Sequence, residues 1–224
     1  MRRIRKSVEP GPLRSWREAL RPRGSIPPWD DFPDPPRLTV RTRLAADQGQ
    51  ICCYCAGTVA RGNFHIEHFR PRETYPRQTY RWANLLASCQ ASGRPPRATD
   101  VIETQQHCGA AKDNWFEDGV TVSPLEANVE GLFRYTLAGK VFPSKSLRGR
   151  YDSVDQTINR LNLNAPLLVA RRAAMLQKAN ADASTLSRAA WTAHYLDPKA
   201  GGQLHEFWPA LRYNYDKFWS ERLA

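Results

Sequence analysis

The sequence predicts an α+β fold in which a cysteine-held core of short strands and turns lies between a basic arm and a helical C-terminal region. Three observations favour this fold class. Almost all metal-capable side chains fall between Ile51 and Asn114, the first 36 residues are rich in Arg and Pro, and helical periodicity begins after residue 150. These changes divide the chain into residues 1–37, 38–150 and 151–224.

Residues 1–37 are expected to form an arm without regular structure. The stretch "RPRGSIPPWDDFPDPPR" is typical of an arm draped over another structure and not of a regular element. The next stretch, "LTVRTRLAADQGQ" (residues 38–50), reads as a short helix whose apolar side carries Leu44, Ala45 and Ala46. We therefore expect the regular structure to begin at residue 38.

The middle of the chain is expected to contain short strands and turns. "CCYCAGTVARGNFHIEHF" has the form of a hairpin, with a cysteine turn, a bend at Gly62–Asn63 and a strand that ends at His68. "RWANLLASC" is expected to be a short helical or turn segment, and "RPPRATDVIETQQ" a polar loop before His107. A second hairpin is expected to turn at Ala138–Gly139.

Residues 151–224 are expected to be helical. The break at Asn164–Pro166 separates two helices, because a residue before proline avoids helical dihedral angles, and Gly201–Gly202 marks a later turn. The aromatic stretch "EFWPALRYNYDKFW" favours core or a partner interface, with stacking on unpaired bases as the alternative. The apolar residues at helical spacing are Val154, Ile158, Leu161, Leu168, Ala174, Leu176, Phe207, Trp208, Leu211, Tyr215 and Phe218.

The charge of the chain favours a polyanionic partner. The net charge is +11 and the isoelectric point is near 9.8, and phosphate contacts supply much of the affinity of proteins for nucleic acid. A basic but inert surface is the alternative. No apolar run approaches the roughly 20 residues of a membrane span, and the basic start lacks the apolar stretch of about 7–15 residues of a secretory signal. We expect a cytoplasmic protein that works without a membrane.

Four of the five cysteines are expected to bind structural zinc. Cys52 and Cys55 have the CxxC spacing with which two thiolates of one turn occupy two corners of a tetrahedron. Cys89 and Cys108 would supply the other two corners. Cys53 lies inside the CxxC turn and is expected to point elsewhere.

One alternative to this ligand set stays open. His107 could replace its neighbour Cys108 as a zinc ligand. A redox-active CxxC is disfavoured, because no βαβ pattern surrounds the motif. A disulfide framework is not expected of five cysteines in a chain without an export signal.

The motif "FHIEHFRP" places His65, Glu67 and His68 between the two halves of the cysteine set. Hydrolysis of a phosphodiester needs a base, a divalent ion and a group that orients the base. Neutral imidazole is a base near pH 7, a carboxylate suits Mg²⁺, and a carboxamide can accept the proton on the other ring nitrogen of the base. If residues 64–68 form a strand, His65 and Glu67 share one face and His68 points to the other.

The motifs "CCYC", "HIEHFRP", "RWANLLASC" and "HCGAAKDN" together resemble the HNH endonucleases of the ββα-metal type. The resemblance implies a zinc-stapled ββα-metal HNH core and metal-dependent hydrolysis of phosphodiester bonds in nucleic acid. It makes Glu67 the metal-binding acid and His68 the general base. Asn84 matches the asparagine that orients the base, and Pro71 matches the proline of the family's acid–His motif.

The resemblance departs from the family pattern in the third motif. That pattern is Cys–Asn/His–x–x–Lys, in which the residue after the cysteine binds the catalytic Mg²⁺ or Mn²⁺ ion, but this chain has Gly109 there. Asn114 is the first candidate for the missing ligand, followed by His107 and Asp113. His65 is expected to support the metal or the phosphate, or else to be a packed histidine.

Basic residues near these motifs are candidates for contacts with nucleic acid. Arg70 and Arg72 follow the histidine cluster and could hold backbone phosphates. Lys112 could contact the scissile strand. A solvated basic surface is the alternative for all three.

The resemblance is narrower when two later motifs, "SPL" and "TINRLNLN", are included. The chain then resembles the small HNH proteins of Septu-type anti-phage systems, and this resemblance covers most of residues 38–165. This implies an anti-phage effector that works with an ATPase of the ABC/SMC class, docked on the C-terminal helices. Some such systems include a retron reverse transcriptase and its msDNA. The substrate would be DNA or tRNA. The alternative function is a non-catalytic, zinc-stapled nucleic-acid-binding or adaptor module.

Overall fold

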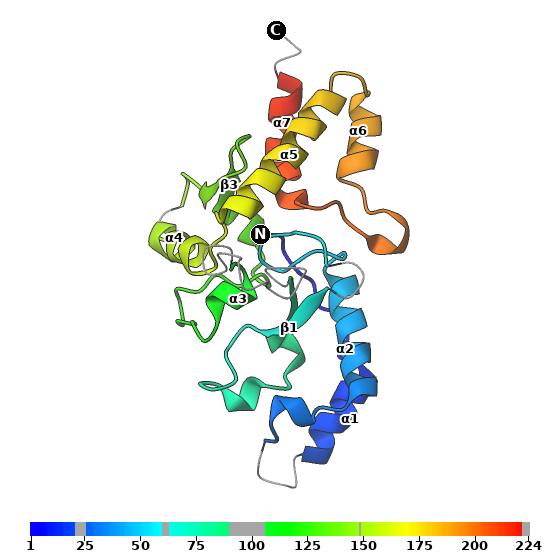
Figure 1. Cartoon of the computed structure of the whole chain (residues 1–224), viewed down its shortest axis with the longest axis vertical. Coiled ribbons are helices and arrows are strands. Elements are labelled where there is room, and N and C mark those ends of the chain that lie inside the picture. The colour runs from blue at the N-terminus through cyan, green and yellow to red at the C-terminus, as the bar shows by residue number, and fades with distance from the viewer. Residues whose placement is uncertain (21–25, 60–62, 90–105, 148, 221–224) are drawn as a thin grey trace, which may run out of the picture.

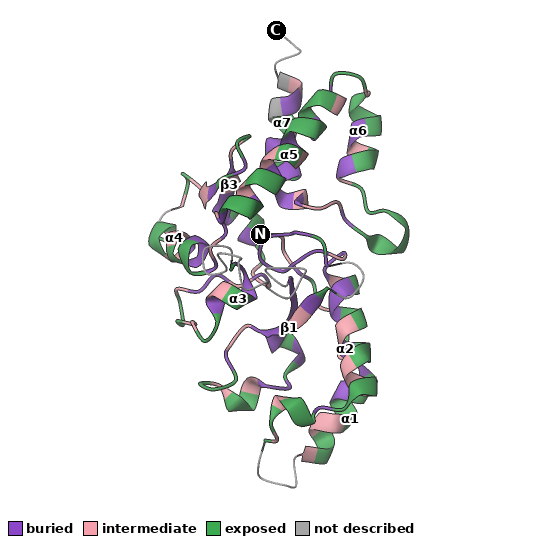
Figure 2. Cartoon of the chain, in the orientation of Figure 1, coloured by how far each residue is buried: buried purple, intermediate pink, exposed green. Residues whose placement is uncertain are grey.

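The structure is a computed structural model that describes residues 1–20, 26–59, 63–89, 106–147 and 149–220. The chain combines helices with two small two-stranded sheets, so the expected α+β class is confirmed. In Figure 1 the molecule is elongated, with the N-terminal helices and the β1 region in its lower part and helices α5, α6 and α7 in its upper part. Buried residues run through both parts, and each helix keeps an exposed side (Figure 2).

Residues 1–37 contain regular structure that their proline content did not predict. Helix α1 (Gly11–Leu20) lies within this segment, and helix α2 (Asp34–Asp47) begins at Asp34 and not at residue 38. The prolines after Asp34 fall in the first turn of α2, where the N–H they lack would have no intrahelical partner. Leu13 and Phe32 are buried, and α1 packs against α2. The expectation of an irregular arm was therefore wrong for these stretches.

The expected helix at residues 38–50 is the greater part of α2. Leu44 and Ala45 are buried as expected, whereas Ala46 is exposed. Single turns of 3₁₀ helix lie at Trp29–Asp31, Pro76–Gln78, Trp82–Asn84, Val129–Leu132 and Ala200–Gly202.

The central sheet pairs strand β1 (Phe64–His68) with strand β2 (Leu85–Cys89) in antiparallel register. The strand that ends at His68 is confirmed, but its partner is β2 and not the cysteine turn. That turn forms an isolated bridge between Ile51 and Thr58. The bend expected at Gly62–Asn63 falls partly outside the described residues.

Strand β2 was missed in the sequence because all five of its residues are buried. A continuous apolar run lacks the alternation that distinguishes a strand from a buried helix. The expectation of a helical turn holds for Trp82–Asn84 and is wrong for Leu85–Cys89. Most of the polar loop expected before His107 lies outside the described residues, and a one-turn helix, α3 (Gly109–Lys112), follows it.

The second expected hairpin is confirmed. Strand β3 (Phe133–Tyr135) pairs with β4 (Val141–Pro143), and Gly139 in the turn has a positive φ of 80°. A Cβ atom at Gly139 would lie 2.2 Å from the carbonyl oxygen of Val169, so this turn also requires glycine for its close approach to α5.

The C-terminal region is helical as expected. Helices α4 (Tyr151–Arg160) and α5 (Pro166–Asp182) are separated at the predicted break, and α6 (Arg188–Tyr195) and α7 (Trp208–Ser220) follow. Helix α7 packs against α5, α6 and β3. The predicted apolar positions are buried except for Ala174, which is exposed, and Trp208 and Tyr215, which are partly buried. The aromatic stretch therefore serves mainly as core.

The hydrophobic core extends from the N-terminal segment to α7, and it includes the cysteines. Within the ranges that the structure describes, none of the helices has the length and apolar character needed to cross a bilayer.

Candidate active site and metal centre

Four cysteines converge at one buried point. The Sγ atoms of Cys52, Cys55, Cys89 and Cys108 all lie within 4.8 Å of one another, and those of Cys55 and Cys89 are 3.6 Å apart. Zinc bound tetrahedrally at about 2.3 Å from each sulfur separates the sulfurs by about 3.8 Å. The donor set and its spacing therefore fit a structural zinc ion, and the four residues are those expected from the sequence.

The surroundings of Cys52 favour its thiolate. The backbone N–H of Cys89 donates to Cys52 Sγ and that of Gly57 to Cys55 Sγ, each at 3.3 Å. Burial raises the pKa of Cys52, but side-chain hydrogen bonds from the other cysteines outweigh it and hold this pKa well below its usual value. Hydrogen bonds to an ionised group stabilise the ionised form.

A buried arginine balances the charge of this centre. Arg172 is 1% exposed, and its guanidinium donates to the carbonyl oxygens of Gly139 and Leu163. Burial lowers its pKa, while the negative charge of Cys55 and Cys108 favours the charged guanidinium. Because four thiolates exceed the charge of Zn²⁺, a nearby cation stabilises the complex.

The other two residues considered for zinc lie beside this centre. Cys53 is not part of the four-sulfur cluster, as expected, and burial raises its pKa well above the usual value, so it stays a thiol. His107 Nδ1 lies 3.3 Å from Cys108 Sγ and 3.7 Å from Cys89 Sγ. His107 is thus a neighbour of the sulfurs, and Cys108 keeps its place in the cluster.

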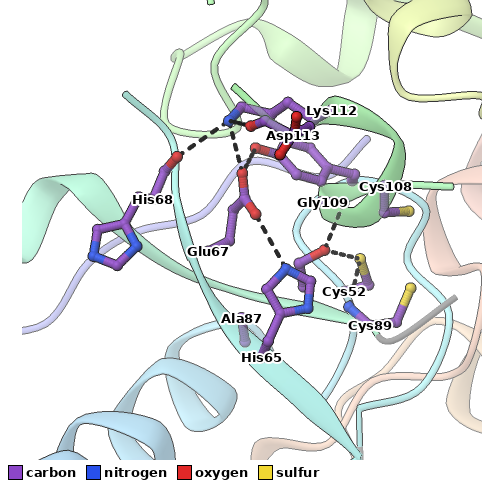
Figure 3. Close-up of polar contacts among 12 residues, drawn as sticks. Cys52, His65, Glu67, His68, Ala87, Cys89, Cys108, Gly109, Lys112 and Asp113 are labelled. Atoms are coloured by element: carbon purple, nitrogen blue, oxygen red, sulfur yellow. Dashed lines mark hydrogen bonds and ion pairs between the residues drawn. The ribbon is translucent and has the colours of Figure 1, made fainter. Parts of the chain in front are cut away.

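Glu67 is buried on the face of β1 that it shares with His65, as the alternation of a strand predicted (Figure 3). Its Oε2 lies 3.2 Å from His65 Nε2. Its Oε1 accepts from Lys112 Nζ at 2.9 Å and from the Tyr54 hydroxyl at 3.1 Å. Burial raises the pKa of Glu67, but its bonds to His65 and Lys112 bring the pKa below its usual value. Glu67 is therefore an ionised carboxylate at neutral pH.

Gly109, at the start of α3, lies directly against this pair. A Cβ atom at position 109 would be 2.4 Å from Glu67 Oε2 and 2.4 Å from His65 Nε2. The two polar atoms therefore occupy the space into which a side chain at position 109 would project. A carboxylate oxygen and an imidazole nitrogen are both donor types that a divalent ion such as Mn²⁺ binds.

His68 lies on the opposite face of the strand end, and its ring points away from the Glu67 carboxylate (Figure 3). Its Nε2 is 3.1 Å from the carbonyl oxygen of Thr79. A carbonyl only accepts, so Nε2 carries the proton and Nδ1 keeps a free lone pair. Burial, followed by the charge of Arg72, lowers the pKa of His68 to about 4. His68 is therefore neutral at pH 7.

Two contacts of His68 have no signal in the sequence. The Thr79 carbonyl is a backbone atom, and Trp29 comes from the N-terminal segment. The rings of Trp29 and His68 meet edge to face, with centroids 4.5 Å apart, and His68 is 9% exposed. Only the folded chain brings these residues together.

Asn84 fixes the loop that carries Thr79. Its Oδ1 accepts from the Arg70 backbone N–H at 2.7 Å, and its Nδ2 donates to the carbonyl oxygens of Arg70 at 3.0 Å and of Gln78 at 3.1 Å. These bonds close residues 70–79 into a compact loop. Asn84 therefore acts on His68 indirectly, because it holds the loop whose Thr79 carbonyl accepts from the imidazole.

The other candidates for the second metal ligand have contacts of their own. Asn114 is exposed, and its Nδ2 donates to Glu73 Oε2 at 2.7 Å. Asp113 contributes its backbone carbonyl, which lies 3.4 Å from Lys112 Nζ. The contacts of Asn114 and His107 thus involve other groups, whereas the Asp113 carbonyl shares Lys112 Nζ with the Glu67 carboxylate.

The expected nucleic-acid contacts differ in their accessibility. Arg70 pairs with Asp118 at 2.7 Å, and its guanidinium lies over the Phe116 ring. Arg72 is exposed and lines an open cavity of about 390 Å³, together with Trp29 and Thr79, which both contact His68. Lys112 is 2% exposed, and its ammonium is bonded to Glu67. The other residues that line the cavity include Glu73, Pro76 and Asn114.

Comparison with known proteins points to one class of enzyme. No protein-family model matches the chain. A protein of Vibrio cholerae serotype O1 biovar El Tor named "Retron Vc95 putative HNH endonuclease" is 25% identical over 144 residues, which are 62% of this chain and 64% of that protein. The match thus spans less than two thirds of the relative's length. This distant similarity supports an HNH endonuclease, the class that the motifs resemble.

Proposed function

We propose that this chain is a metal-dependent HNH endonuclease that hydrolyses phosphodiester bonds in nucleic acid. The observation that carries the proposal is the placement of an ionised Glu67 and a neutral His68 on adjacent positions of one strand end, beside a four-cysteine cluster. The similarity to the Vibrio cholerae protein supports the same class. The basic charge of +11 suits a polyanionic substrate.

His68 is the general base in this proposal. The Thr79 carbonyl holds the Nε2 proton, so Nδ1 accepts the proton of the attacking water. The His68 pKa of about 4 applies while Trp29 covers the imidazole ring. Displacement of Trp29 by substrate would both open Nδ1 and raise this pKa towards neutrality, where a base works best.

Glu67 holds the divalent ion in this proposal. When bound, Mg²⁺ or Mn²⁺ would offset the charge that develops on the phosphate and on the leaving oxygen. Lys112 and Tyr54 bind Oε1 of Glu67 and leave Oε2 facing His65 and Gly109. Asn84 keeps the loop with Thr79 and Arg72 in place, and Arg72 and Arg70 bind backbone phosphates.

The biological setting is proposed from the resemblance. We assign the chain the role of an anti-phage effector that works with an ATPase of the ABC/SMC class, docked on α5–α7. The retron in the relative's name supports a system with a reverse transcriptase and its msDNA. The substrate is DNA or tRNA.

A second candidate function is a non-catalytic zinc-stapled nucleic-acid-binding or adaptor module. One observation favours it: His68 is 9% exposed beneath Trp29, and Glu67 is 5% exposed. Binding of a polyanion needs neither side chain.

One experiment separates the two functions. The zinc-loaded chain, alone and with the product of a neighbouring ATPase gene, is incubated with plasmid, single-stranded DNA and total tRNA, with Mn²⁺ and without added divalent ions. Mn²⁺-dependent cleavage of any substrate supports the nuclease. Gel-shift binding of these substrates with no cleavage in any of the mixtures supports the adaptor module.

A further inference from the structure

We infer that His65 Nε2 and Glu67 Oε2 form a two-ligand site for a divalent cation above Gly109. This inference rests on the proposed function. It names the second protein ligand of the catalytic ion, which the sequence left open. It makes His65 a metal ligand and gives Gly109 a specific reason to be glycine.

The spacing of the two atoms fits adjacent ligands of one ion. His65 and Glu67 are two positions apart on β1, so both side chains leave the same face of the strand. Their ligand atoms are 3.2 Å apart. Neighbouring ligands of an octahedral ion, with bonds of about 2.1 Å, are about 3.0 Å apart.

The lack of a side chain at position 109 leaves room for both ligand atoms. The nearest atoms to a Cβ at this position are Glu67 Oε2 and His65 Nε2, both at 2.4 Å. Any other residue would press on both ligand atoms at once. The backbone N–H of Gly109 donates to Ser88 Oγ at 3.1 Å, which fixes the start of α3 against β2 and holds this arrangement.

The site opens to solvent on the side of His65. The His65 side chain is 35% exposed, whereas that of Glu67 is 7% exposed. An ion can therefore enter past the imidazole and keep water on its remaining positions, as Mg²⁺ and Mn²⁺ usually do. To bind, His65 carries its proton on Nδ1 and offers Nε2.

The other contacts of Glu67 leave one oxygen for the ion. Lys112 and Tyr54 both bind Oε1, so Oε2 is the atom that faces His65. Imidazole nitrogen binds transition metals more readily than it binds Mg²⁺. The ligand pair therefore predicts stronger binding of Mn²⁺ than of Mg²⁺.

The test is a titration of the zinc-loaded full chain with Mn²⁺, followed by the paramagnetic resonance signal of free Mn²⁺. The wild-type chain is expected to bind one Mn²⁺ with displacement by excess Mg²⁺. His65→Ala is expected to weaken binding by about 10- to 100-fold or more. Gly109→Ala is expected to weaken it as well, and His194→Ala, an exposed histidine on α6, is the matched control.

A spin-echo measurement of the bound Mn²⁺ gives a direct readout of the ligand. Coupling to the ¹⁴N of an imidazole is expected in the wild-type chain and in His194→Ala, and its loss is expected in His65→Ala. Equal affinity and equal coupling in His65→Ala would overturn the inference. Zinc content and thermal unfolding are measured for each variant. If Gly109→Ala fails to fold, the comparison of His65→Ala with the wild-type chain decides whether His65 binds the ion.

Glu67→Gln separates the failure of this inference from failure of the proposed function. Loss of Mn²⁺ in Glu67→Gln with full binding in His65→Ala would overturn the role of His65 alone. Unchanged Mn²⁺ binding in both variants would show that Glu67 does not bind the ion, and it would contradict the proposed metal site as well.

Discussion

The indole ring of Trp29 lies edge-on against the imidazole ring of His68, with centroids 4.5 Å apart and planes at 88°. Trp29 belongs to the N-terminal segment, whereas His68 ends strand β1. The segment expected to be an irregular arm therefore covers the candidate base. Burial is the main reason that the pKa of His68 is lowered to about 4.

Removal of the indole ring should raise the pKa of His68. In Trp29→Ala, water reaches the imidazole and stabilises its charged form, so the pKa is expected to move from about 4 towards the usual 6.5. NMR titration of the histidine ring protons measures the change. Trp208→Ala, on α7, is the control and should leave the pKa of His68 where it is. A His68 pKa unchanged in Trp29→Ala would contradict the role given to this contact.

His68 should also make the stability of the fold depend on pH. Its pKa is about 4 in the folded chain and about 6.5 when unfolded, so the unfolded chain binds more protons between these values. The stabilising contribution is present above pH 6.5 and is lost as the pH falls to 4. In His68→Asn, the fall in unfolding free energy between pH 7 and pH 4.5 should be smaller by on the order of 2–3 kcal/mol. Denaturant titration at both pH values measures it, and equal falls would speak against a buried neutral His68.

Substitution of Cys52 should abolish zinc binding, whereas substitution of the adjacent Cys53 should not. Cys52→Ala removes one of four converging sulfurs and is expected to lose bound zinc and cooperative unfolding. Cys53→Ala removes a buried thiol outside the cluster and is expected to keep one zinc ion per chain. Elemental analysis of the purified variants measures this. Zinc lost from Cys53→Ala and kept by Cys52→Ala would show that the ligands are assigned incorrectly.

Asn84 should stabilise the loop of residues 70–79. Asn84→Ala removes three hydrogen bonds to backbone atoms, each worth about 0.5–1.5 kcal/mol. Faster hydrogen exchange is expected in residues 70–79, with zinc content unchanged. Asn159→Ala, an exposed position on α4, is the control. Exchange in the loop as slow as in the wild-type chain would mean that Asn84 does not hold it.

The cysteine cluster could be predicted from the sequence because its information is local. CxxC spacing and two further cysteines name all four residues of the cluster. The side-chain alternation of β1 likewise predicted that His65 and Glu67 would share one face and that His68 would face away. The Asn164–Pro166 break was predictable for the same reason, since proline acts on its neighbour.

Contacts between distant segments could not be predicted. Strand β2, the partner of β1, could not be recognised because Leu85–Cys89 is buried on both faces. Such burial removes the alternation of polar and apolar residues by which a strand is identified in a sequence. Trp29 meets His68 only because α1 and α2 fold the N-terminal segment against the core. The sequence identified Gly109 as a departure, but only the packing shows that Glu67 Oε2 and His65 Nε2 fill the space before it.

The role of His68 as the general base is tested by the rate of Mn²⁺-dependent cleavage in His68→Ala. This rate is measured in single-turnover conditions on the substrate that the wild-type chain cuts, with His194→Ala as the matched control. We expect a fall of about 10²–10⁴-fold for His68→Ala, with zinc content and thermal unfolding at pH 7 preserved, and an unchanged rate for His194→Ala. Cleavage by His68→Ala at the wild-type rate would contradict the proposed nuclease mechanism.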